Sequence, residues 1–307
     1  MGFGQHPPAY LRPGDEVEIN VTGLGTLKNR IAMPGTCNRT LNRYQSVISA
    51  FQYVNSTKLP ESKASITINK KPLYYKSFGK SDGPTIVFVH GLGATTEYFS
   101  PLISHLKLDE EHNLHLYDFE GHGLSPTHPL SKLSIATLAT DLNGIFEHAG
   151  ISSKATLIAD GLGCLIALQF VKSHPDKVSK SILLSPPPSP VPDDLSIGLL
   201  KRAAIARKQG MTAVVDPVAN NTIEFTLTRL GSLARAAQRM SLLGQDPEGY
   251  AKACTAFSEV TETQETVGSA NVHVFSTRER TTEAFVSDDW SIFQNLDEVA
   301  NFVRKVL

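Results

Sequence analysis

Residues 157–168, LIADGLGCLIAL, place an apolar strand, a glycine-rich turn and an apolar helix in succession. When such a turn has the spacing G-x-S-x-G, its central side chain is presented at the end of the strand as a nucleophile for acyl transfer. The central position here is Gly161, which offers neither oxygen nor sulfur. The stretch therefore has the frame of a hydrolytic turn without the attacking atom.

Two neighbouring side chains are alternative nucleophiles. Asp160 lies one residue before the centre of the turn, and Cys164 lies three residues after it. The dipole at a helix N-terminus favours negative charge, so we expect Asp160 to be a surface or capping carboxylate. A small thiol one turn into an apolar helix is typical of core packing, which is our expectation for Cys164.

Two further glycine turns follow apolar strands. IVFVHGLGATTEYF ends a strand in His90-Gly91-Leu92-Gly93, and LHLYDFEGHGLS ends another in the pattern Asp118-x-x-Gly121-His122-Gly123-x-Ser125. None of the turns completes G-x-G-x-x-G, which argues against a dinucleotide site. We expect His90 and His122 to shape their turns by hydrogen bonding rather than to transfer protons.

In order and spacing, these three stretches resemble the α/β-hydrolase superfamily. Residues 242–257, LLGQDPEGYAKACTAF, are similar to the segment that returns from the cap to the core in small-molecule esterases and enol-lactonases, and the sequence as a whole resembles a fungal branch of that group. The resemblance implies an α/β fold with a mostly parallel sheet, helices on both faces and a helical cap. It also implies that the backbone amides of Leu92 and Leu162 form an oxyanion hole, and that His90 and Gly91 belong to the binding turn.

The same resemblance implies a catalytic histidine before a tryptophan near the end of the chain. The matching text is Asp289-Trp290, so Asp289 occupies the histidine position, and no histidine follows His273. We expect His273 itself to be a side chain on a sheet face. The orienting acid should follow a further strand within residues 261–288, but these 28 positions are fewer than the roughly 35–45 residues that the implied elements need. We therefore expect one strand-helix unit, with its acid, to be missing near the C-terminus.

Periodicity predicts alternating strands and helices after residue 64. The predicted strands are 66–68, 73–77, 86–89, 114–118, 155–159, 181–185 and 272–275, and the predicted helices are 98–106, 135–149, 163–173, 196–210, 230–243 and 296–307. Residues 187–250 are mostly helical and should form the cap. The domain expected from this pattern is 64–307.

The first part of the chain has a different texture. Within residues 1–31, the pattern predicts two strands, 16–21 and 26–31, joined by a glycine-rich turn. The whole segment resembles the C-terminal end of fumarylacetoacetate hydrolase family proteins. A fusion arising from the gene model, a packing arm and a functional module remain alternatives, although a single hairpin cannot bury a core. Residues 32–63 are interpreted as a linker.

Composition limits the partners. The chain has 29 basic and 30 acidic residues, which gives no electrostatic reason to expect nucleic acid or an anionic membrane. Cys37, Cys164 and Cys254 are far apart and suggest neither disulfides nor a metal site, so we expect a cytoplasmic protein with no metal and no cofactor.

The functional hypothesis is a superfamily member that tailors or binds a small acyl, lactone or aromatic metabolite in fungal secondary metabolism, with its triad lost. The alternative is a non-catalytic binding or scaffolding protein. Whether the chain is an enzyme stays open, and the sequence does not indicate its oligomeric state.

Overall fold

The computed structural model describes residues 16–21, 25–30, 62–222, 229–262, 271–276 and 290–307. The chain divides into two compact units, Met1–Ser56 and Thr57–Leu307. In the first unit, β1 (Glu16–Val21) and β2 (Gly25–Arg30) form an antiparallel hairpin, which confirms the two strands predicted there. The predicted linker, residues 32–63, lies outside the described residues except for its last two positions, where β3 already begins.

The second unit is built on a seven-stranded sheet of order β3-β4-β6-β5-β7-β8-β9. Its strands are β3 (Ser62–Ile68), β4 (Lys71–Gly79), β5 (Thr85–Val89), β6 (Asn113–Tyr117), β7 (Ala155–Asp160), β8 (Val178–Leu184) and β9 (Val272–Phe275). β3, β4 and β6 pair antiparallel, and the remaining pairs from β6 to β9 are parallel. The predicted α/β fold with a mostly parallel sheet is therefore confirmed.

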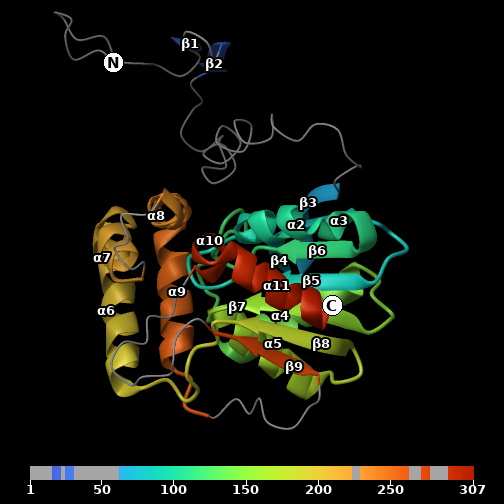
Figure 1. The fold of residues 1–307 in the computed structure, drawn as a ribbon. Helices are drawn as coiled ribbons and strands as arrows, with labels where there is room; N and C mark the ends of the chain where they lie inside the picture. Colours follow the sequence, from blue (N-terminus) through green and yellow to red (C-terminus); the bar gives the residue numbers. More distant parts are fainter. Residues whose placement is uncertain (1–15, 22–24, 31–61, 223–228, 263–270, 277–289) are drawn as a thin grey trace, which may run out of the picture. The chain divides into compact units, whose positions relative to one another are not determined.

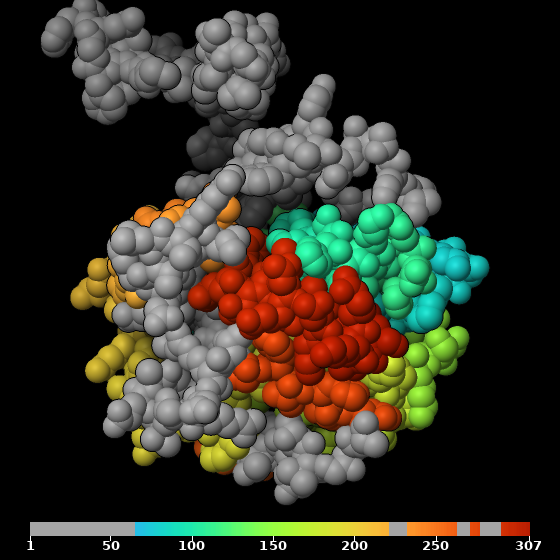
Figure 2. All heavy atoms as spheres, in the orientation of Figure 1, coloured from blue at the N-terminus to red at the C-terminus, as the bar shows by residue number. Residues whose placement is uncertain are grey.

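Helices cover both faces of this sheet (Figure 1). One face carries α4 (Ile135–His148) and α5 (Leu162–Ser173). The other carries the short helix η1 (Thr96–Phe99), α2 (Ser100–Leu106), α3 (Leu108–Glu111), α10 (Ser291–Gln294) and α11 (Leu296–Val306). Figure 2 shows residues 290–307, in red, directly against the green-cyan segment that contains α2.

Central strands are apolar on both faces because each face is covered. In β5, Val87 and Val89 pack into the core beneath α4 and α5, whereas Ile86 and Phe88 pack beneath α2 and α11. This alternation follows from the two-residue period of a strand. Burial of each such side chain stabilises the fold by about 1.5–3 kcal/mol, which fixes the register of the strand.

The cap consists of α6 (Asp193–Gln209), α7 (Thr212–Thr222), α8 (Arg229–Leu243) and α9 (Pro247–Ser258), which Figure 1 shows as a helical group at one end of the sheet. Helices α6 and α8 match the two predicted cap helices. Helices α7 and α9 were not predicted, and α9 continues eight residues beyond the predicted end of the cap at 250.

Among the described residues between α9 and α10, β9 is the one strand. Most of the segment in which a second strand and the acid were sought, residues 263–270 and 277–289, lies outside the described residues. No helix within the described ranges is long and apolar enough to cross a membrane.

Candidate functional site

The bend between β7 and α5 has the backbone geometry of a nucleophile-bearing turn. Gly161 has φ 50° and ψ −121°, a conformation that L side chains rarely adopt. Its N–H donates to the carbonyl of Leu184 in the neighbouring strand at 3.0 Å, which fixes the bend at the carboxyl edge of the sheet. The register predicted from sequence, with Gly161 at the apex, is the register that the structure has.

Gly163 explains why the helix can follow the strand so closely. A Cβ at this position would lie 2.2 Å from the carbonyl oxygen of Val89 and 2.6 Å from that of His90. Both contacts are to backbone, which cannot move aside like a flexible side chain. The absence of a side chain at Gly163 therefore lets the first turn of α5 lie against the end of β5.

The two amides expected to form the oxyanion hole lie at adjacent strand ends. Leu162 is the first residue of α5, and the first four N–H groups of a helix have no intrahelical acceptor. Leu92 follows β5, which pairs with β7 through Val89 and Ala159. Among the described residues, neither amide donates to a backbone carbonyl. An oxyanion hole requires N–H groups without a protein acceptor, and that these two amides form one stays a prediction.

Asp160 is neither a surface residue nor a helix cap, so that expectation was wrong. Its side chain is buried, and the residue in the cap position of α5 is Gly161, which makes no side-chain cap. The Tyr98 hydroxyl donates to Asp160 Oδ1 at 2.9 Å, and Tyr98 Oη accepts from the Ile292 amide at 3.4 Å. Burial, followed by the Asp160 charge, raises the pKa of Tyr98 well above its ordinary value, so the phenol stays protonated as the donor.

These contacts join three parts of the chain that are distant in sequence: the bend, η1 and α10. Trp290 completes the group, because its ring packs edge-on against Tyr98 with ring centroids 5.2 Å apart. Asp160 therefore acts as a structural acceptor beneath the bend. The sequence carried no signal for this, since its partner is 62 residues away.

Cys164 is buried, in agreement with the packing role expected for it. Its Sγ donates to the carbonyls of Ala159 and Leu184, each at 3.3 Å. Burial, and after it the Asp160 charge, raises the pKa of the Cys164 thiol well above its ordinary value. Because the thiolate is the nucleophilic form, this environment does not suit attack on a substrate.

Hydrogen bonds hold both ring nitrogens of His90. Nδ1 lies 2.9 Å from the carbonyl of Gly91 and donates to it, while Nε2 accepts from the Phe119 amide at 3.2 Å. Burial lowers the pKa of His90 to about 4, so the ring is neutral at pH 7. This is the turn-shaping geometry expected for His90. His122 is also fully buried and packs against Phe119 with ring centroids 4.2 Å apart, but neither of its ring nitrogens has a hydrogen-bond partner among the described residues, so the hydrogen-bonding role expected for His122 was wrong.

The position that the resemblance assigns to the catalytic histidine carries a carboxylate in this sequence. Asp289 lies outside the described residues, and the residue after it, Trp290, is buried beside Tyr98. His273 lies in β9 opposite Ile182 and is partly buried, as expected of a side chain on the sheet.

The cap is bound directly to the loop that carries Leu92. Ser241 Oγ and Gln245 Nε2 donate to the carbonyl of Gly93 at 2.7 and 3.0 Å, and Gln245 Oε1 accepts from the Gly123 amide at 3.0 Å. A Cβ on Gly93 would lie 2.6 Å from Leu242 Cδ2. The end of α8 thereby fixes the two glycine turns relative to each other. Neither Ser241 nor Gln245 was predicted from the sequence, because their partners lie 148 and 122 residues away.

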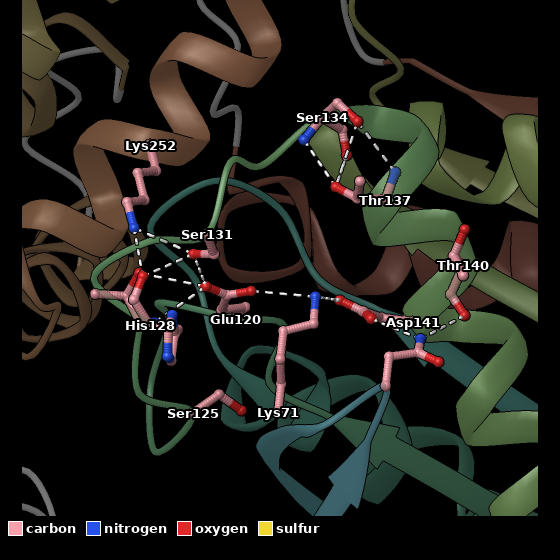
Figure 3. A network of polar contacts seen from close by, with 12 residues as sticks. Lys71, Glu120, Ser125, His128, Ser131, Ser134, Thr137, Thr140, Asp141 and Lys252 are labelled. Carbon is pink, nitrogen blue, oxygen red and sulfur yellow. Dashed lines mark hydrogen bonds and ion pairs between the residues drawn. The ribbon is translucent and has the colours of Figure 1, made fainter.

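A largely buried ionic network joins the loop after β6 to β4 and α4 (Figure 3). Lys71 Nζ lies 3.1 Å from Glu120 Oε2 and also contacts Asp141 of α4. Burial alone would raise the pKa of Glu120, but hydrogen bonds from Ser131 and the His128 amide, with Lys71, lower it. Glu120 Oε1 therefore accepts the hydrogen bonds, while Oε2 faces the Lys71 ammonium.

The other end of the network belongs to the cap. Lys252 of α9 donates to the carbonyl of His128 at 2.6 Å and to Ser131 Oγ at 3.1 Å. Lys252 therefore links α9 to the loop that carries His128 and Ser131. Within the described ranges, no group of three His, Cys, Asp or Glu side chains is placed to hold a metal ion.

The parallel sheet, the helical cap and the sharp β7–α5 bend are features of one class of protein. Comparison with known proteins identifies that class. The family model described as alpha/beta hydrolase fold matches residues 84–301, more than two thirds of the chain. The chain therefore belongs to the alpha/beta hydrolase family.

Individual relatives are more distant. A 3-oxoadipate enol-lactonase of Acinetobacter baylyi is 26% identical over 203 residues, which are 64% of this chain and 71% of that protein. Among solved structures, the enol-lactonase from Burkholderia xenovorans LB400 has a TM-score of 0.65 at 20% identity and covers 80% of this chain and 99% of its own. A thermophilic esterase from Thermogutta terrifontis has a TM-score of 0.67 at 18% identity, over 80% and 97%. At these identities the solved structures establish the fold alone.

Proposed function

We propose that this chain binds a small acyl, lactone or aromatic compound at the β7–α5 bend and does not hydrolyse it. The observation that carries the proposal is the conformation of Gly161, which has the bend of a nucleophile-bearing turn and no side chain at its apex. A hydrolase of this class needs a nucleophile, an imidazole and a carboxylate that orients the imidazole. Neither alternative nucleophile suits attack on a substrate: Asp160 accepts the Tyr98 hydrogen bond, and the pKa of the Cys164 thiol is raised.

The backbone amides expected to bind a ligand oxygen also support the proposal. The Leu92 and Leu162 amides have no backbone acceptor within the described residues, and the cap holds the Leu92 loop in place through Gly93. Two fixed N–H donors suit a ligand carbonyl oxygen. The relatives named for enol-lactone and ester hydrolysis make lactones and esters the first ligands to test.

A residual catalytic role is the competing hypothesis, in which the protein tailors its ligand. Removal of the whole triad in a well-studied protease leaves about 10³–10⁴-fold acceleration over water, from the oxyanion hole and binding. We expect this chain to show no more than that with 4-nitrophenyl acetate, and to show no burst of 4-nitrophenol.

The test has two arms. In the first, hydrolysis of 4-nitrophenyl acetate is measured for the wild type, Asp160→Asn and Cys164→Ser, and equal rates are expected for all three. A rate that falls in either variant would identify a substitute nucleophile and overturn the proposal. In the second, thermal stabilisation is measured across a panel of lactones, esters and aromatic acids. A flat response across the panel would count against binding.

We infer a narrower context for the chain on the resemblance alone: a fungal protein of secondary metabolism, located in the cytoplasm, with residues 1–31 derived from a fumarylacetoacetate hydrolase relative. Sequencing the transcript tests the origin of residues 1–31 and 261–288. A transcript that lacks residues 1–31 would remove that segment from the protein.

A further inference from the structure

Ser185 combines two features that are unfavourable for the fold. It follows β8 directly and has φ 48°, in the left-handed region that favours glycine. The residue is only 7% exposed, and its buried Oγ has no hydrogen-bond partner among the residues that the structure describes. Its backbone N–H is satisfied by the carbonyl of Phe275 in β9 at 2.8 Å. A strained backbone and an unsatisfied hydroxyl at one residue call for a physical explanation.

The position of Ser185 is beside the bend. In the parallel pair of β7 and β8, Asp160 is the register partner of Leu184, so the next residues along the two strands are Gly161 and Ser185. The carbonyl of Leu184 accepts from Gly161 N–H and from Cys164 Sγ, which ties the peptide before Ser185 to the first turn of α5. Neighbouring strands lie about 4.8 Å apart, so one small molecule can span the two strand ends.

The chemistry of the two sides is complementary. The Leu92 and Leu162 amides can only donate, and they suit one carbonyl oxygen. A serine hydroxyl can donate to a second oxygen on the same carbon. We infer that the Ser185 hydroxyl binds the ring or ester oxygen of a lactone or ester whose carbonyl oxygen faces the two amides. This inference rests on the proposed function and adds to it a third polar group and a ligand class with two oxygens on one carbon.

The burial of the hydroxyl has two consequences. A ligand reaches Oγ only after a local opening at the carboxyl edge of the sheet, which reduces the apparent affinity by the fraction of open protein. In the absence of ligand, the unpartnered hydroxyl destabilises the fold, so its removal should raise the melting temperature. A purely structural serine would behave in the opposite way, because its removal would break a hydrogen bond.

The experiment compares two ring compounds of matched size. δ-Valerolactone has two oxygens on one carbon, and cyclohexanone has one. Dissociation constants for wild type and Ser185→Ala are measured by NMR titration, and the melting temperature of each ligand-free protein is measured in parallel. We expect Ser185→Ala to weaken δ-valerolactone by roughly 3- to 10-fold, the value of one neutral hydrogen bond, and to leave cyclohexanone unchanged. The ligand-free variant should melt at a higher temperature than the wild type.

Each other outcome overturns the inference in a different way. Equal δ-valerolactone affinity in the two proteins overturns the role of Ser185 and leaves the proposed function standing. Binding of neither compound by the wild type overturns both. A lower melting temperature for ligand-free Ser185→Ala shows that the hydroxyl is structural. Ser185→Gly guards against a folding artefact, because it removes the same hydroxyl and also relieves the backbone strain.

Discussion

Substitution of Gly161 tests whether the apex of the bend is held in a strained conformation. Because φ is 50° there, any L side chain is placed in a sparsely populated region, at a cost of about 1–3 kcal/mol. For a unit of the size of Thr57–Leu307, that cost corresponds to a melting temperature lower by roughly 2–12 °C. We therefore expect Gly161→Ala to be less stable than the wild type in both thermal and urea unfolding.

Gly198 provides the matched control. It lies inside α6, and a Cβ built on it meets no heavy atom within 4 Å. Since glycine in the middle of a helix is less favourable than alanine, Gly198→Ala should be more stable by about 0.5–1 kcal/mol. The same change of residue should thus have opposite signs at the two positions. Equal effects at Gly161 and Gly198 would refute the assignment of the apex.

Gly161→Ser extends the test to catalysis. The variant returns a hydroxyl to the apex, but both nitrogens of His90 are already engaged and Asp160 is held by Tyr98. Since both of these candidate bases are engaged, we expect no burst of 4-nitrophenol from 4-nitrophenyl acetate and no more than a few-fold change in the steady rate. A burst equal to the enzyme concentration would show that a complete acid-base partner exists.

Three further predictions concern the supports of the site. Gln245→Ala should lower the free energy of unfolding by about 1–3 kcal/mol, because it removes hydrogen bonds to two backbone groups of the glycine turns, whereas Gln209→Ala at an exposed helix end should change it little. Glu120→Gln should cost on the order of 2 kcal/mol through its lost charged hydrogen bonds, with the exposed Glu111→Gln as the control, both by urea unfolding. Burial lowers the pKa of His90 to about 4, so between pH 6.5 and 4 the unfolded chain binds more protons than the folded protein. The free energy of unfolding should therefore fall as the pH is lowered through this range, and it should fall less steeply in His90→Gln.

Local pattern was sufficient for most of the fold. The sheet strands were predicted because a buried parallel strand is a short apolar run bounded by turn residues, and β9 has the predicted bounds. Helix α7 escaped prediction because it contains Pro217, and proline inside a helix normally argues for its end. Helix α9 was also not predicted, although Asp246 as its N-cap and a proline as its first residue form a recognisable start signal.

The site could be predicted only in part, for a physical reason. Glycines at a bend leave a mark in the sequence because only a residue without Cβ fits there, and Gly163 against the Val89 carbonyl is such a case. Side-chain partners leave no such mark. The Tyr98–Asp160 hydrogen bond and the Gln245 contacts depend on which segments the topology brings together, and no local rule encodes that.

Gly161 and Ser185, which follow the neighbouring strands β7 and β8, both have positive φ, but the steric penalty differs between them. At Gly161 the conformation is free of steric penalty, whereas at Ser185 a side chain is kept in the left-handed region with its hydroxyl unsatisfied. If the fold alone dictated both bends, glycine would suit both positions. Ser185→Gly is therefore a discriminating variant: greater stability is expected whether the bend is a relic or a binding site, but weaker δ-valerolactone binding is expected only if the hydroxyl holds the ligand. Greater stability with unchanged lactone affinity would indicate that the edge is a relic of a hydrolase.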